Sequence, residues 1–181
     1  MNGYIKFDRF IDLEASLEQL LAQIQRGEMT PTSWKWALIA AHSALQGSIC
    51  IALRGSAGFD TWKPSHLKKW LDAYEKNKDL PDPHLDYFME LFDRLFDGES
   101  GVNRDLIKWL NDSRNNLIHF NTDHYSIERK SIVCAIDASV VATIAASTRS
   151  KGIFFYDEQQ PERFYMLCES IRARLKMLVD A

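Results

Sequence analysis

Residues 34–53, WKWALIAAHSALQGSICIAL, form an unusually apolar segment of this 181-residue chain. Apolar residues lie on nearly every side of its helical projection, which is typical of a helix at the centre of a bundle. His42 lies inside this segment, where we expect it to bond a neighbouring helix or the backbone, and a functional role stays open as the alternative. The segment therefore predicts a long buried helix over about residues 33–54.

Elsewhere the apolar residues recur at every third or fourth position, and only 8 glycines and 5 prolines interrupt them. This spacing predicts further helices, over about residues 8–26, 63–78, 81–99, 103–119, 126–146 and 161–179. Gly27 is expected to end the first of these helices, and Asn103 to cap the fourth. GIFFY, residues 152–156, is either a short strand or a buried connection. We expect residues 1–181 to form one domain, an all-α bundle of about six to seven helices.

The composition narrows the class of protein. With 46% hydrophobic residues the chain can build one core, and its net charge of −3 and pI near 5.9 give it no overall basic field for nucleic acid. We identify neither a signal peptide nor a run of about 18 apolar residues, so we expect a soluble, cytoplasmic protein with no membrane partner. The cysteines are odd in number and far apart, which predicts core thiols rather than disulfides or zinc ligands. They are Cys50, Cys134 and Cys168.

Two further groups of residues have both a structural and a functional interpretation. Asp86, Glu90, Asp93 and Asp97 share one face of the helix predicted over residues 81–99. This indicates a solvated surface, with docking of a basic partner or a metal as alternatives. Two aromatic pairs can pack in the core or an interface, or can stack on bases, and the scarcity of basic residues around them favours packing. These pairs are Trp34 with Trp36 and Phe154 with Phe155.

The motif SRNNLIHF, residues 113–120, ends the helix predicted to begin at Asn103. Histidine can act as base or acid near neutral pH, and a guanidinium can hold two phosphate oxygens while it stays charged. On a helix Asn115 and His119 share a face, and Arg114 lies on its flank. The three are therefore candidates to hold a phosphate and to move a proton. In the structural alternative, Arg114 bonds an acid on a neighbouring helix and His119 caps the helix end.

The surrounding segment LNDSRNNLIHFNTDHYSIE, residues 110–128, resembles the signature of the HEPN superfamily, all-α domains with an Arg-polar-x3-His motif. The apolar segment 34–53 is similar to the long early helix of one prokaryotic branch of that group. By this resemblance Arg114 and His119 correspond to the catalytic pair and Asn115 to the polar position. The resemblance implies a metal-independent endoribonuclease without a cofactor, a toxin or defence protein, that dimerises through the motif helix.

The expected substrate is single-stranded or loop RNA, cut to leave a 2′,3′-cyclic phosphate. The resemblance also implies a cognate antitoxin or a nucleotidyltransferase-like protein as a partner. Because one chain has a single motif histidine, a twofold dimer would supply a base and an acid in one cleft. Asn111 and Asn115 are then expected to face the partner copy. The alternative within the same family is a catalytically inactive binding or scaffold module that binds a nucleotide or a protein.

Overall fold

The computed structural model describes residues 3–26, 30–54, 58–98, 101–120, 123–150 and 152–179. These residues contain seven α-helices and no strand, so the prediction of an all-α bundle of six to seven helices is confirmed. Gly27, predicted to end the first helix, lies outside the described residues. The helices are α1 Arg9–Ile24, α2 Pro31–Leu53, α3 Pro64–Glu75, α4 Phe88–Phe96, α5 Arg104–Ile118, α6 Arg129–Thr148 and α7 Gln160–Val179.

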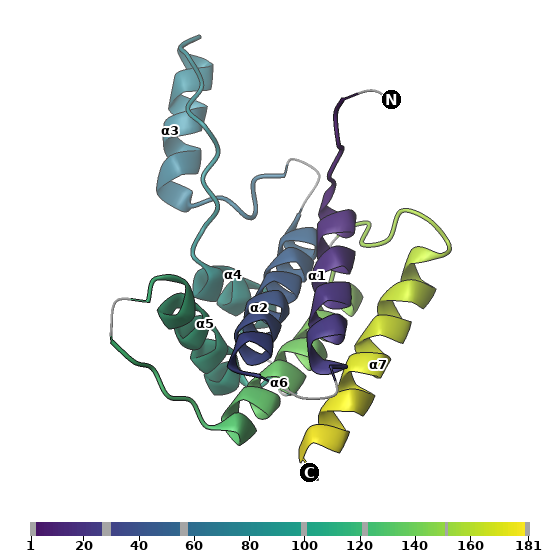
Figure 1. The fold of residues 1–181 in the computed structure, drawn as a ribbon. Helices are drawn as coiled ribbons and strands as arrows, with labels where there is room; N and C mark the ends of the chain where they lie inside the picture. Colours follow the sequence, from purple (N-terminus) through teal and green to yellow (C-terminus); the bar gives the residue numbers. More distant parts are fainter. Residues whose placement is uncertain are drawn as a thin grey trace.

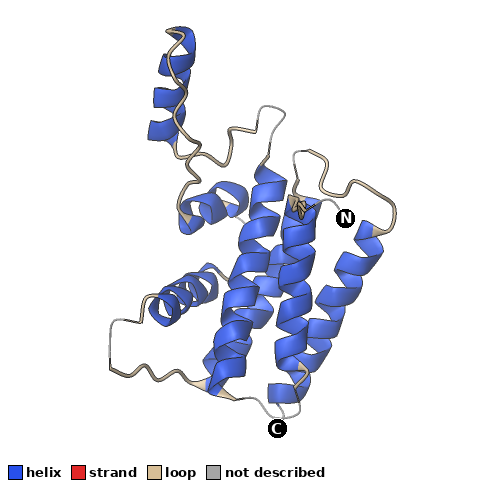
Figure 2. Cartoon of the chain, turned by 45° about the horizontal axis from the view of Figure 1, so that its top comes forward, coloured by secondary structure: helices blue, strands red, loops and turns tan. Residues whose placement is uncertain are grey.

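Helices α1, α2, α6 and α7 form a four-helix bundle, in which α1 and α6 each pack against both α2 and α7. Helices α4 and α5 cover the outer side of α2, and α5 also packs against α6 (Figure 1). Both views place α3, α4 and α5 on the side of the bundle away from α7 (Figures 1 and 2). The central position predicted for α2 is confirmed, because α2 contacts α1, α4, α5 and α6.

The side chains of α2 explain its central position. Of its 23 residues 13 are buried, which is more than one face of a helix can supply. Leu38, Leu45 and Ile49 are fully buried, and alanines between them let neighbouring helices approach closely. The buried hydroxyl of Ser48 donates to the carbonyl of Leu45 at 2.8 Å, so this polar group is satisfied inside the core.

Helices α2 and α6 are each long and apolar enough to cross a membrane, judged by length and composition alone. Within the bundle, however, 67% of the apolar window of α2 and 50% of that of α6 are buried. The core helices of soluble proteins have the same composition. The fold is therefore compatible with a soluble protein.

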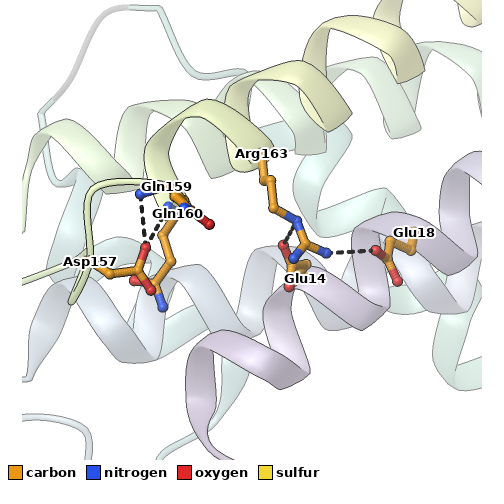
Figure 3. Close-up of polar contacts among 6 residues, drawn as sticks. All are labelled: Glu14, Glu18, Asp157, Gln159, Gln160 and Arg163. Atoms are coloured by element: carbon orange, nitrogen blue, oxygen red, sulfur yellow. Dashed lines mark hydrogen bonds and ion pairs between the residues drawn. The ribbon is translucent and has the colours of Figure 1, made fainter.

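Polar contacts fix the start of α7 beside α1 (Figure 3). Asp157 precedes the helix, and its Oδ1 accepts from two backbone N–H groups at the helix start at 2.9 and 2.8 Å, as an N-terminal cap does. Arg163 follows within the first turn and forms ion pairs with two acids of α1, Glu14 at 2.8 Å and Glu18 at 3.3 Å. Exposed pairs of this kind add little stability, so the apolar side of α7 supplies most of its attachment.

The aromatic pairs pack largely as predicted. Phe154 is buried and Phe155 half-buried, and both ring centroids lie within 5.8 Å of that of Phe164 on α7. The GIFFY segment is therefore a connection rather than a strand, and only Phe154 and Phe155 of it pack inward, since Gly152, Ile153 and Tyr156 are exposed. Trp34 is half-buried against the core, whereas Trp36 is exposed, so packing in an interface and stacking on a base both stay open for it.

The cysteines are free thiols, of which Cys168 is buried and Cys50 and Cys134 are half-buried. Burial raises the pKa of Cys50 to about 11 and that of Cys168 to about 12. These two side chains therefore stay protonated at neutral pH, as predicted for core thiols.

The helix predicted over residues 81–99 spans only Phe88–Phe96. Pro81 and Pro83 disfavour helical angles at residues 80 and 82, and residues 84–86 pair with residues 61–63 through backbone hydrogen bonds instead of joining the helix. Gly98 has a φ of +71°, in the left-handed region that commonly follows a helix end. The first part of the predicted helix is instead an irregular segment that returns from α3.

The prediction of one solvated acidic face is wrong for Asp86, whereas Glu90, Asp93 and Asp97 lie at the surface. Asp86 lies before α4, is buried, and accepts from Arg94 Nη2 at 2.6 Å. Asp93 accepts two hydrogen bonds from Arg104 of α5, both at 2.6 Å, while Glu90 is exposed. Asp86 therefore holds the α4 region together instead of facing water, while the pair of Asp93 and Arg104 lies at the surface. In the part of the chain that the structure describes, no three His, Cys, Asp or Glu side chains gather as metal ligands would.

Helix α3 lies away from the bundle (Figure 1), and none of its residues is buried. It belongs to a projecting segment, residues 59–87, that we call the arm. The rings of Phe59, Trp62 and Trp70 pack together there, with centroids between 5.1 and 5.9 Å apart. The arm therefore has a small aromatic cluster of its own.

Candidate functional site

The motif lies at the C-terminal end of α5, whose start is capped as predicted. Asn103 Oδ1 accepts from the backbone N–H of Leu106 at 3.1 Å. Ile107 and Leu110 are fully buried, and α5 packs against α2 and α6, so the bundle holds one side of the helix. The last turn, up to Ile118, presents the motif at the edge of this contact.

Asn115 connects the other two motif residues. Arg114 Nη1 donates to Asn115 Oδ1 at 2.9 Å, and the backbone N–H of His119 donates to the Asn115 carbonyl, also at 2.9 Å. Arg114 and Asn115 are half-buried, whereas His119 is exposed just beyond the helix end. The structure thus brings all three predicted residues to one helix end, with the imidazole open to solvent.

The structural alternative for this motif holds only in part. His119 does end the helix, but through its backbone N–H rather than its imidazole. Among the described residues Arg114 has no ion pair with an acid of another helix, and its partner is the neighbouring amide. Its Nε is buried without a hydrogen-bond partner, and an unsatisfied buried donor costs roughly 1–3 kcal/mol. Because this Nε is covered by protein, a ligand could reach only the outer nitrogens of the guanidinium in this arrangement.

His42 of α2 reaches α5 close to the motif. It is 2% exposed, and its Nε2–H donates to Oδ1 of Asn111 on α5 at 3.1 Å. Its ring also packs on Phe88 of α4, with the ring centroids 4.2 Å apart. The prediction that His42 bonds a neighbouring helix is confirmed, and this side chain joins α2, α4 and α5 where they meet.

Burial fixes the protonation state of His42. It lowers the pKa of the ring to about 4; the hydrogen bond with Asn111 opposes this shift, and the positive charge of Arg114 adds to it. The ring is therefore neutral at pH 7, and its Nδ1 keeps a lone pair without a hydrogen-bond partner. A neutral His42 leaves the guanidinium as the positive charge at this part of α5.

Asn111 is not free to face a partner copy as expected, because its side-chain oxygen is bonded to His42. It lies three and four residues before Arg114 and Asn115, a spacing that puts the three on one side of the helix. That part of the arrangement was visible in the sequence. The contact with His42 was not, because it depends on how α2 packs against α5.

Two exposed apolar side chains flank the motif histidine. Ile118 is 41% exposed and Phe120 is 51% exposed. Apolar residues beside polar ones on a surface are typical of a region that another molecule covers. The end of α5 therefore combines a guanidinium, an exposed imidazole and an apolar rim.

No protein-family model, no curated protein and no solved structure matches this chain. Its function is therefore inferred from the residues at the end of α5 and from the motif they form.

Proposed function

We propose that this protein is a HEPN-like, metal-independent endoribonuclease that acts as a homodimer in the cytoplasm. The observation that supports this most is that Arg114, bonded to the Asn115 side chain, and the exposed His119 lie at the same helix end. RNA cleavage needs a positive charge for the phosphate and a group that moves protons at one point. The resemblance of the motif to that superfamily adds the substrate class, single-stranded or loop RNA.

In the proposed reaction His119 removes the proton of a 2′-hydroxyl, and the 2′-oxygen attacks the adjacent phosphorus. The bond between phosphorus and the 5′-oxygen breaks, and the 5′-oxygen takes a proton from His119 of the second copy. Arg114 stabilises the negative charge that develops on the phosphate oxygens, while Asn115 holds Arg114 in position. The products are a 2′,3′-cyclic phosphate and a 5′-hydroxyl.

The second copy is proposed to cover the end of α5, with Ile118 and Phe120 as its apolar contacts. A dimer that persists in solution needs at least about 1,000 Å² of buried surface in total. Ile118→Asp should give a folded monomer that cuts no RNA, and Met166→Asp, the same kind of change at an exposed apolar position of α7, should stay dimeric. Light scattering at micromolar concentrations distinguishes these states. A monomeric unmodified protein would contradict the mechanism with two histidines.

The most direct experiment incubates the purified protein with labelled RNAs in EDTA. We expect fragments ending in a 2′,3′-cyclic phosphate, and none from Arg114→Ala or His119→Ala variants with native circular dichroism. Asn115→Ala should cut more slowly, because Arg114 loses its partner. Asn116→Ala removes an exposed amide from the next position and should cut like the unmodified protein. Unchanged cleavage in both Arg114→Ala and His119→Ala would end the proposal.

A binding module without catalysis is the second candidate, because the half-buried guanidinium of Arg114 can hold a phosphate without any proton transfer. In that case no RNA is cut, while a nucleotide raises the Tm of the protein, and this increase disappears in Arg114→Ala. A cognate antitoxin or a nucleotidyltransferase-like protein would be the protein partner under either function.

A further inference from the structure

The base of the arm holds basic side chains that the proposed reaction does not use. The chain enters and leaves the arm side by side, because Lys63 N–H donates to the carbonyl of His84 at 2.9 Å and Asp86 N–H to that of Thr61 at 3.0 Å. This backbone pairing brings the rings of His66 and His84 together, with centroids 4.0 Å apart. Two segments of the arm therefore present their basic residues at one place.

Lys63, His66, Lys69 and His84 form what we call the basic cluster. Desolvation lowers the pKa of His66, and the positive charges of His84, Lys69 and Lys63 lower it further. Helix α3 begins at Pro64 in the middle of this cluster, and the first turn of a helix adds partial positive charge. Like charges that the backbone holds together are stabilised when an anion binds between them.

The arm carries six carboxylates beside its five lysines. Asp72 is paired with Lys76 and Asp86 with Arg94, each at 2.6 Å. The charges that shift the pKa of His66 are all positive, and no carboxylate is among them. The charges that act on His66 are therefore positive, within an arm whose five lysines and six acids give a formal net charge of −1.

We propose that the basic cluster binds the phosphate backbone of single-stranded RNA, an inference that rests on the proposed function and names where its substrate is held. Tyr87 adds a surface for a base, because its side chain is 68% exposed. Lys63 Nζ donates to the Tyr87 hydroxyl at 3.2 Å and lies 4.4 Å from the ring centre. Exposed aromatic rings beside cations are typical of proteins that bind single strands.

The basic cluster is connected to the motif through packed side chains. Tyr87 is followed by Phe88, which packs on His42, and His42 bonds Asn111 one turn before Arg114. The arm, α4 and α5 also lie on the same side of the bundle (Figures 1 and 2). An RNA strand held at the basic cluster is thus anchored on the side of the protein that carries the motif.

The test measures RNA binding separately from cleavage. Fluorescence anisotropy follows a short labelled single strand whose 2′-hydroxyls are methylated, so that it cannot be cut. The double variant Lys63→Gln/Lys69→Gln should raise Kd at least about tenfold and reduce the slope of log Kd against log salt by roughly 0.7 for each phosphate that the variant no longer binds. Lys130→Gln/Lys176→Gln removes the same charge from exposed positions outside the arm and should change neither quantity.

An unchanged Kd in the arm variant, or an equal increase of Kd in the control variant, would overturn the inference. Binding to phosphatidylserine vesicles in place of RNA would overturn it too. His119→Ala should bind the methylated strand as tightly as the unmodified protein. If binding depends on the basic cluster but natural RNA is never cut, the inference stands and the endoribonuclease proposal fails. If RNA is cut while the arm variant binds and cuts normally, the inference fails and the proposed function stands.

Discussion

His42 and His119 both touch α5, one near its middle and the other at its end. His42 is buried where α2, α4 and α5 meet, bonds Asn111, and is neutral at pH 7 because its pKa is about 4. His119 is exposed, and a backbone hydrogen bond to Asn115 sets its position. A side chain held in this way can meet a substrate, whereas the buried ring cannot. The same residue type therefore differs in what it can do according to its packing, because burial restricts His42 to holding helices together and exposure leaves the His119 side chain open to other molecules.

The largest expected effect is on the rate of RNA cleavage, and it tests whether His119 has a different role from His42. His119→Ala should slow cleavage roughly 100- to 10,000-fold, because it removes a general acid and base. The free energy of unfolding should change by no more than about 0.5 kcal/mol, because the side chain is exposed. Single-turnover cleavage and urea unfolding measure the two quantities. A decrease of several kcal/mol in stability would make His119 a structural residue like His42.

The second prediction concerns substitutions of the buried histidine, His42. His42→Ala should lower the free energy of unfolding by about 3 to 4 kcal/mol, because it leaves a cavity beside Phe88 and an unpaired Asn111 oxygen. His42→Gln keeps a donor that can reach Asn111 and should be destabilised less. Urea unfolding measures the free energy of unfolding of both variants, provided that the m-value stays unchanged. A decrease below about 1 kcal/mol for His42→Ala would show that this side chain does not hold the helices together.

The pH dependence of stability sharpens the same contrast. The pKa of His42 is about 4 in the folded protein and about 6.5 in the unfolded chain, so between these values only the unfolded chain binds the proton. The free energy of unfolding should therefore fall by about 3 kcal/mol as the pH drops from about 6.5 to 4, and stay constant for this group above that range. The difference between the unmodified protein and His42→Gln isolates this contribution. Parallel pH curves for the two would show that His42 is not buried in its neutral form.

The sequence predicted the helices well where one local pattern decides them. Asn103 caps α5 as expected, and the apolar segment 34–53 lies within the central helix α2. The start of α4 was predicted too early, because Asp86 looks like part of an acidic helical face. Its partner Arg94 becomes evident only in the folded chain. The periodicity of apolar residues therefore located the helices, but not the tertiary contacts that decide where a helix begins.

At the candidate site too, some groupings of residues could be predicted from the sequence and others could not. Arg114, Asn115 and His119 could be grouped from the sequence, because one helical turn brings them together. The hydrogen bond of His42 with Asn111 spans 69 residues and depends on the packing of α2 against α5. No periodicity contains that information, so the sequence left two interpretations of His42 open.

The smallest expected effect comes from two asparagine substitutions at opposite ends of α5. Together they test whether cleavage depends on the stability of the helix or on the arrangement of its C-terminal residues. Asn103→Ala removes the acceptor for the Leu106 N–H at the start of the helix and should lower the free energy of unfolding by about 1 kcal/mol. Well below the midpoint of thermal unfolding it should cut RNA like the unmodified protein, because Arg114 and His119 keep their hydrogen bonds to Asn115. Asn115→Ala, the same change at the other end, should cost a similar amount of stability but slow cleavage. If both variants slow cleavage equally, activity depends on the stability of α5 as a whole, and the exposed end has no separate role.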